Sequence, residues 1–285
     1  MLRGRCPVVA LGRHRPPAVL EGVEWRDAPD LQEESAHWLN VLSGIDVIVH
    51  LAAIAHLTGP VDPRRESLIW RVNAIGPQTI ANACIAAGVS RLVFLSSIKA
   101  VAERSTSGIS VDACPAPGDA YGRAKHAAEE ALLRIGCESS LDVAIARCPL
   151  IYSRTAQGNL KALARIIRLP IPLPFGSIRN RRSLVALNTL CSALAHLALA
   201  RTPQSGIYHI ADRAPYSTAD IVRLVAKING LEARVFPCPE PLVRAAVAMI
   251  GGASAVDRLL GSLELETADT FARMGWWPPD EPSSS

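Results

Sequence analysis

Tyr121 and Lys125 are the two residues whose types and spacing point most directly to chemistry. They stand four positions apart in a segment predicted to be helical, so both side chains lie on one face of that helix. A tyrosine hydroxyl titrates near pKa ~10 and acts as an acid or base at neutral pH only where a nearby cation favours its phenolate. Lys125 is placed to supply that cation. The alternative is a solvated helix face on which the two residues coincide by chance.

Ser97 strengthens the chemical interpretation. The apolar run 92–95 leads into Ser96 and Ser97, as expected of a buried parallel strand with polar residues at its carboxyl end. Sites in parallel sheets lie at those ends. Ser97 is therefore a candidate to hydrogen-bond a substrate hydroxyl or keto oxygen that Tyr121 protonates, an arrangement suited to hydride transfer. The structural alternative is a turn or capping serine.

The elements that must position these residues alternate between strand and helix. Periodicity predicts strands at 7–11, 23–25, 47–51, 91–95 and 141–146, and helices at 33–42, 72–87 and 120–135. This order predicts an α/β fold, a Rossmann-like doubly wound parallel sheet. After residue 151 the pattern is less regular. It predicts a helix at 188–199, a strand at 206–211, and a capping-box spacing at 217–220 before a helix at 221–228.

Composition excludes several classes of function. The 285 residues are 49% hydrophobic, 20% charged and 5% aromatic, with a net charge of +4 from dispersed Lys and Arg. That composition fits a globular protein with small anionic ligands and argues against nucleic-acid binding. Seven scattered cysteines predict neither a zinc site nor a disulfide framework, and a reducing cytoplasm is expected. No apolar run has membrane-spanning length, so membrane insertion is not expected.

Several stretches together resemble one family over nearly the whole chain. They are Asp46–Ala53, Val72–Asn73, Gly88–Lys99, Tyr121–Lys125, Arg147–Tyr152, Gly158–Leu160 and Pro172–Leu184. Their order and spacing resemble the extended short-chain dehydrogenase/reductases, within the NAD-dependent epimerase/dehydratase family of UDP-glucose 4-epimerase-like enzymes and nucleotide-sugar 4-ketoreductases. The resemblance implies a dinucleotide-binding domain over 1–152 and about 184–212. A smaller C-terminal α/β substrate lobe would cover 153–183 and 213–285.

The resemblance also implies roles for individual residues. Tyr121 would be the general acid/base, Lys125 would lower its pKa and hold the nicotinamide ribose, and Ser97 would bind the reacting sugar oxygen. The remaining cofactor-binding positions implied are Asp30, Leu31, Leu51, Ala52, Ala53, Asn73 and Pro149. Asn159 and Arg182 would hold the nucleoside diphosphate, because a guanidinium offers phosphate a bidentate contact. For Arg182 the alternative is a surface arginine in a basic loop.

The sequence departs from the family at the phosphate-binding turn. A glycine-rich G-x-x-G-x-x-G loop is absent from these residues, and we expect the chain to begin just before the second strand of the fold. A βα unit of roughly 30 residues would then be missing. The sheet would lack an inner strand and expose apolar edges. NAD is the expected cofactor, with NADP as the alternative because Arg13 follows the first strand.

The function expected is an NAD(P)-dependent nucleotide-sugar epimerase. It would act at C4 of a UDP-hexose through a 4-keto intermediate, in the synthesis of cell-surface polysaccharide precursors. Two alternatives stay open: a nucleotide-sugar 4-ketoreductase, and a truncated remnant that no longer binds the dinucleotide. The expected assembly is a homodimer packed through the helices near 74–87 and 124–133.

Overall fold

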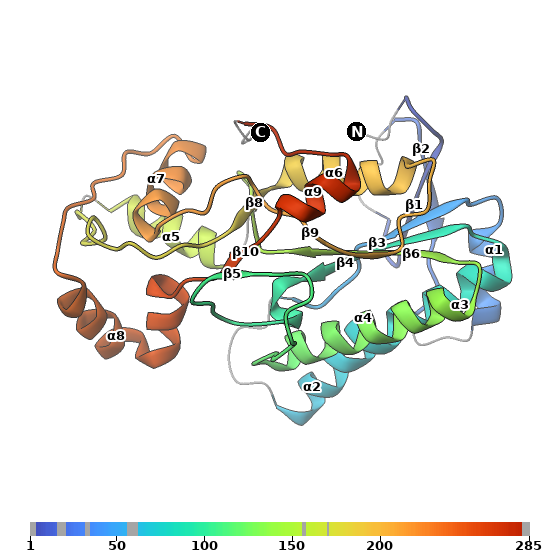
Figure 1. The fold of residues 1–285 in the computed structure, drawn as a ribbon, viewed down its shortest axis with the longest axis horizontal. Helices are drawn as coiled ribbons and strands as arrows, with labels where there is room; N and C mark the ends of the chain where they lie inside the picture. Colours follow the sequence, from blue (N-terminus) through green and yellow to red (C-terminus); the bar gives the residue numbers. More distant parts are fainter. Residues whose placement is uncertain are drawn as a thin grey trace. The chain divides into compact units, whose positions relative to one another are not determined.

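A computed structural model describes residues 4–15, 21–31, 35–55, 62–155, 158–169 and 171–280 (Figure 1). The chain forms two compact units. Unit 1 spans 1–101, 114–147 and 191–208, and unit 2 spans 102–113, 148–190 and 209–285. The predicted division differs from these units in four segments: 102–113, 148–152, 184–190 and 209–212.

The main sheet of unit 1 consists of strands close to the predicted positions. Its order is β3-β4-β6-β9, with β3 at Val47–His50, β4 at Arg91–Ser97, β6 at Asp142–Cys148 and β9 at Gly206–His209. β3 and β4 are parallel, with Val47 opposite Arg91. The helices α3 (Gly76–Ala87) and α4 (Ala120–Glu138) lie on one side of these strands. Helix α6 (Leu187–Leu199) lies on the other side (Figure 1), as expected of a doubly wound fold.

A second parallel sheet in unit 1 pairs β1 (Val8–Gly12) with β2 (Val23–Asp27). The single sheet that the sequence predicts is thus observed as two hydrogen-bonded sheets in the described part of unit 1. The expectation of a missing inner strand stays a prediction.

The described helices of unit 1 are α1 (Ser35–Leu42), α2 (Pro63–Trp70), α3 (Gly76–Ala87), α4 (Ala120–Glu138) and most of α6 (Leu187–Leu199), which begins in unit 2. Asp62 and Asp119 cap the starts of α2 and α4. Gly88 follows α3 with a φ of 74°, a left-handed conformation that glycine adopts readily, so the helix ends at the predicted residue 87. The prediction of a helix at 72–87 is wrong at its start, because α3 begins only at Gly76. A π-helical turn at Arg71–Ile75 joins it to α2, and the periodicity predicted neither this turn nor α2.

Unit 2 is built from short strands and helices. β7 (Leu150–Tyr152) pairs with β8 (Leu184–Ala186), and β5 (Gly108–Ile109) pairs with β10 (Glu264–Leu265). The helices are α5 (Asn159–Ile167), α7 (Thr218–Ile228), α8 (Glu240–Leu260) and α9 (Ala268–Met274). Ser217 and Asp220 form the predicted capping box of α7.

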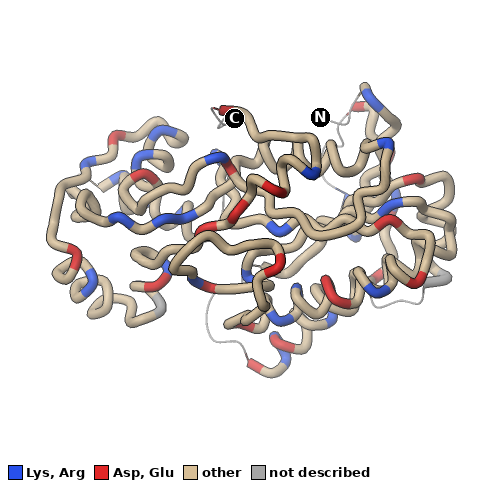
Figure 2. The backbone as a smooth tube through the Cα atoms, viewed as in Figure 1, with Lys and Arg blue, Asp and Glu red and all other residues tan. Residues whose placement is uncertain are grey.

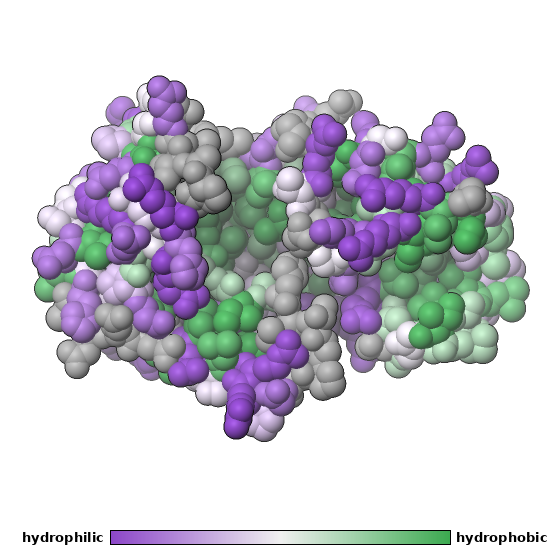
Figure 3. Space-filling model, turned by 180° about the vertical axis from the view of Figure 1, so that it is seen from behind, coloured by the Kyte–Doolittle hydropathy of each residue, from purple (hydrophilic) through white to green (hydrophobic). Residues whose placement is uncertain are grey.

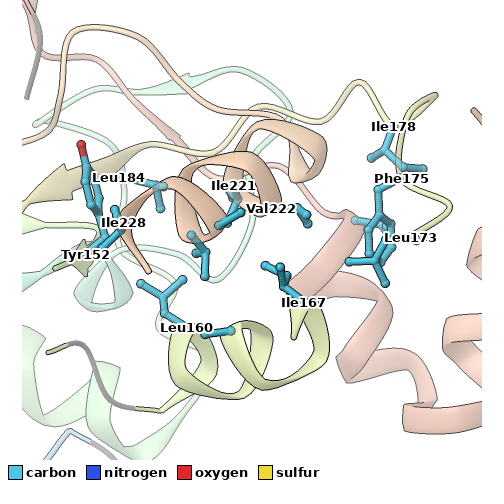
Figure 4. Packing of buried hydrophobic residues seen from close by; sticks show 14 of the residues in the cluster. Tyr152, Leu160, Ile167, Leu173, Phe175, Ile178, Leu184, Ile221, Val222 and Ile228 are labelled. Atoms are coloured by element: carbon cyan, nitrogen blue, oxygen red, sulfur yellow. The ribbon is translucent and has the colours of Figure 1, made fainter. Parts of the chain in front are cut away.

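Each unit has its own hydrophobic core. In unit 1, Leu42, Phe94 and Leu132 are fully buried where helices pack on the sheet. In unit 2, Leu160 of α5 and Ile228 of α7 belong to a cluster that Figure 4 shows from close by. Apolar side chains also gather in patches on the surface face shown in Figure 3. Basic and acidic residues are interspersed in both units (Figure 2).

Arg91 connects the start of β4 to the end of α6. Its Nε donates to Asp142 Oδ2 at 2.6 Å, and its Nη1 and Nη2 donate to the carbonyls of Ala200 (2.8 Å) and Thr202 (2.7 Å). The side chain is only 10% exposed. Carbonyls at a helix C-terminus have no partner within the helix, so this guanidinium satisfies groups that the fold would otherwise bury unpaired.

We expect Arg91→Leu to lower the free energy of unfolding by about 3–5 kcal/mol, because it removes the cation paired with the Asp142 carboxylate and the donor to several nearly buried carbonyls. Urea denaturation measures the change. The control is Arg134→Leu, which removes an exposed arginine of α4 and should change stability by less than about 0.5 kcal/mol. Equal losses in the two variants would contradict the role assigned to Arg91.

Candidate active site

The end of β4 and the start of α4 lie against each other. Ser97 is the last residue of β4, and its Oγ accepts a hydrogen bond from the Lys99 N–H at 3.3 Å. Asp119 caps α4 by accepting from the Gly122 N–H at 2.7 Å. Lys99 Nζ lies 2.6 Å from Asp119 Oδ2. The ion pair therefore joins the segment after Ser97 to the helix that carries Tyr121.

Gly122 allows this approach. A Cβ atom at this position would lie 2.3 Å from the carbonyl oxygen of Lys99 and 3.2 Å from Pro117 Cβ. The nearest atom is backbone, so it cannot move aside as a flexible side chain would. The glycine beside Tyr121 therefore sets how closely the first turn of α4 packs on the segment that follows Ser97.

Lys125 is buried one turn after Tyr121. The residue is 1% exposed, and its Nζ donates to the Leu95 carbonyl at 2.8 Å. The same nitrogen lies 4.3 Å from the centroid of the Phe94 ring, a cation–π distance. The structure therefore brings Ser97, Tyr121 and Lys125 together at the carboxyl end of β4, where the sequence predicted a site.

His50 completes the surroundings of Lys125. It ends β3, is buried, and stacks on Phe94 with a centroid distance of 5.8 Å. Burial, together with the positive charge of Lys125, lowers the pKa of His50 to about 3. The imidazole is therefore neutral at physiological pH. Its Nε2 makes no hydrogen bond within the described residues.

The segment after β3 is held in place by Asn73. Leu51, Ala52 and Ala53 are exposed. The buried Asn73 amide accepts from the Ile54 N–H at 2.9 Å and donates to the Ile54 carbonyl at 3.0 Å. Ile54 in turn packs in a small apolar cluster with the partly buried Tyr121. Asn73 thus fixes the path of the exposed segment, and its direct contact with a dinucleotide stays a prediction.

The remaining predicted residues of unit 1 lie after β2. Asp30 Oδ2 is 3.8 Å from Arg13 Nη1 in an exposed ion pair. Leu31 is half-buried against the start of α3, since a Cβ on Gly76 would lie 3.1 Å from the Leu31 side chain. The arginine that hinted at NADP and the aspartate expected at the adenine end are therefore neighbours.

Three predicted residues belong to unit 2. Pro149 is buried between β6 and β7, and Asn159 is exposed at the first position of α5. Arg182 donates through Nη1 to the Gly261 carbonyl at 2.9 Å and the Asp257 carbonyl at 3.3 Å, at the end of α8. Its guanidinium thus contributes to the packing of unit 2, and a contact with a nucleoside diphosphate stays a prediction.

Sequence reasoning missed a buried charge cluster beneath the site. Glu129 of α4 accepts from Arg147 Nη2 at 2.7 Å and from the Ser96 hydroxyl, and all three residues are at most 3% exposed. A signal was present, because Glu129 follows Tyr121 and Lys125 at the same four-residue spacing.

Two further findings concern the described residues. They contain no group of three or more His, Cys, Asp or Glu side chains arranged to hold a metal ion. Among their helices, none is both long enough and apolar enough to cross a bilayer.

Comparison with known proteins identifies the family. The fold and the site together define a Rossmann-like α/β protein with a Ser-Tyr-Lys constellation. Residues 9–211 match the NAD dependent epimerase/dehydratase family, and the chain belongs to that family. It is 32% identical over 246 residues to UDP-glucose 4-epimerase of Vibrio cholerae, covering 84% of this chain and 74% of that protein.

Two other similarities are informative. A ceramide reductase of Caulobacter vibrioides is 27% identical over 241 residues, which cover 84% of this chain and 68% of that protein. The fold matches a solved structure of UDP-glucuronic acid 4-epimerase from Bacillus cereus in complex with NAD, with a TM-score of 0.72 and 15% identity. That match covers 97% of this chain and 87% of the other.

We expect Gly122→Ala to lower the free energy of unfolding by about 1–3 kcal/mol, because the added methyl group overlaps the Lys99 carbonyl and α4 must shift. Urea denaturation provides the measurement. Arg123→Ala is the control, since this exposed neighbour forms only a surface ion pair with Glu66, worth at most about 1 kcal/mol. A Gly122→Ala variant as stable as the control would disprove the close approach.

Stability should also depend on His50 below neutral pH. Its pKa is about 3 in the folded chain and 6.5 in the unfolded chain, so the unfolded state binds the extra proton between these values. The stabilisation is complete above about pH 6.5 and is lost as the pH falls, by at most about 1.4 kcal/mol per pH unit. Urea denaturation from pH 7 to 4.5 should show a shallower pH dependence for His50→Leu than for wild type. Replacing the exposed His14 with Gln should leave the slope unchanged.

Proposed function

We propose that this chain is an NAD-dependent epimerase that inverts C4 of a UDP-hexose through a 4-keto intermediate. The observation that carries the proposal is the grouping of Ser97, Tyr121 and Lys125 at the junction of β4 and α4, with the Lys125 ammonium buried against Leu95 and Phe94. The similarity to a UDP-glucose 4-epimerase supports the same substrate class.

The residues divide the proton chemistry among them. The Tyr121 phenolate takes the proton from the C4 hydroxyl and later returns it, and the positive charge of Lys125 favours that phenolate. Ser97 donates a hydrogen bond to the sugar oxygen while it is a ketone. The keto sugar must present its other face between the two proton transfers. A bound NAD would accept the hydride from C4 and return it.

The described residues fit the nicotinamide half of such a cofactor. Leu51–Ala53 offers an exposed apolar stretch that leads into Ile54, which shares a small cluster with Tyr121. Lys125, one turn after Tyr121 on α4, is assigned to a ribose hydroxyl. Asp30 and Leu31 are assigned to the adenine end, with Pro149 on the nicotinamide. We assign the pyrophosphate to no residue here, because residues 1–285 contain no glycine-rich phosphate loop.

The proposal also covers the nucleotide contacts, the pathway and the assembly of the enzyme. Asn159 and Arg182 are assigned to the nucleoside diphosphate, and the product would feed cell-surface polysaccharide synthesis in the cytoplasm. A homodimer packed through α3 is supported by Ile75 and Ile85, two apolar side chains of this region that are 42% exposed. Exposed apolar groups on a helix favour association.

A nucleotide-sugar 4-ketoreductase is the second candidate. The similarity to a ceramide reductase favours it, because that protein is named for a net reduction. The same three residues would then protonate a keto substrate once. The two functions differ in whether reduced cofactor is consumed in proportion to product.

Tyr121→Phe should lower kcat with UDP-glucose by about 10²–10⁴, because it removes the only hydroxyl assigned to proton transfer. The assay measures UDP-galactose formed with NAD present. Tyr216→Phe is the matched control, since it removes a hydroxyl bonded to Asp212 in unit 2, and it should retain activity.

The wild-type chain decides among the alternatives in the same assay. Turnover without net loss of NADH supports the epimerase, and stoichiometric oxidation of NADH or NADPH with a 4-keto sugar supports the reductase. No binding of NAD by the folded wild type would favour the remnant. Full activity of Tyr121→Phe would overturn the assignment of the acid/base.

A further inference from the structure

Unit 2 contains a cavity of about 230 Å³ between α5 and α7, beside the segment that follows β7. Its apolar wall is made by Leu160 and Ala164 of α5 and by Val225 and Ile228 of α7. Figure 4 shows Tyr152, Leu160 and Ile228 converging on this part of the unit. Neither Asn159 nor Arg182 is among its described lining residues. We call it the α5–α7 cavity.

The polar side of the α5–α7 cavity is strongly basic. Arg154, Lys161, Arg165 and Arg168 all line it, whereas no Asp or Glu is among the described lining residues. The hydroxyl groups of Ser153 and Thr155 also line it. Like charges gathered around one cavity repel one another, and a bound anion would turn that repulsion into attraction.

The helix dipole accounts for only part of this pattern. Arg165 and Arg168 stand at the C-terminal end of α5, where cations complement the dipole. Lys161 is in the first turn, where the dipole favours anions, and α5 has no acidic residue there. Arg154 precedes the helix altogether. The dipole of α5 therefore gives no reason for a cation at these two positions.

We propose that the α5–α7 cavity binds a small phosphorylated anion, with diphosphate as its best-fitting class. Three guanidinium groups offer paired donors that match phosphate oxygens. The volume is below the ~300–1,000 Å³ of sites for drug-sized ligands, so the ligand is compact. This site uses none of the residues assigned to the epimerase chemistry, and the inference goes beyond that function.

Isothermal titration of inorganic pyrophosphate into the full chain, at low ionic strength and without metal ions, tests the proposal. We expect one saturable site. The double variant Arg165→Gln/Arg168→Gln should weaken Kd at least about tenfold, which corresponds to about 1.4 kcal/mol. The matched control is Arg258→Gln in the last turn of α8, which complements a dipole but does not line the cavity. It should leave Kd unchanged.

A second variant, Thr155→Glu, tests the same cavity independently in case the double variant misfolds. Thr155→Glu adds a carboxylate to an exposed position of the cavity without altering α5, and it should weaken pyrophosphate binding to a similar extent. Absence of saturable binding in wild type would overturn the proposal. So would equal weakening by Arg258→Gln, or unchanged binding in both the double variant and Thr155→Glu.

Two further binding measurements distinguish the α5–α7 cavity from the proposed active site. Tyr121→Phe should bind pyrophosphate with the wild-type Kd whether or not the chain turns over UDP-glucose. Saturating UDP-glucose should not displace pyrophosphate. Displacement would overturn the proposal of a separate site, because the anion would then belong to the substrate site.

Discussion

The burial of two charges on one face of α4 is the constraint on which the candidate site depends. Lys125 and Glu129 are each 1% exposed, and a buried charge costs several kcal/mol unless it is paired and hydrogen-bonded. Leu95 and Phe94 satisfy Lys125, while Ser96 and Arg147 satisfy Glu129. Partners for both charges lie on adjacent positions of β4, so α4 can pack in only one register. That register puts Tyr121 beside the end of β4.

The exit from β3 is held by a separate polar contact. Asn73 sits in the π-helical turn between α2 and α3, where the extra residue per turn aims its amide at both backbone groups of Ile54. A buried amide satisfied in this way cannot rotate without losing two hydrogen bonds. The exposed segment Leu51–Ala53 and the ring of Tyr121 are consequently held by the same small cluster. Rigid placement of this kind is what a hydride-transfer site requires.

The sequence was sufficient for elements with strong local signals. β4, α4 and α7 could be predicted because apolar runs, the Gly88 cap and the Ser217–Asp220 box act over a few residues. The π-helical turn and the division into two sheets could not, since both depend on contacts between distant segments. The Tyr121–Lys125 pair could be singled out as a candidate from its spacing only together with Ser97 at the end of the preceding apolar strand. The partners of Glu129 and Arg91 could not be predicted, because they lie 18 or more residues away in the chain.

A net charge of +4 says little about ligands until the cations are sorted by their partners. Arg91 and Arg147 are nearly buried and paired with carboxylates, so they contribute to folding and their charge is balanced within unit 1. Arg123 and Arg181 form ion pairs at the surface, where salt screens them. The cations of the α5–α7 cavity differ in sharing one concave wall with no described carboxylate. A small anion is attracted by positive charge that is concentrated at one place on the surface. The net charge of the whole chain does not reveal such a place.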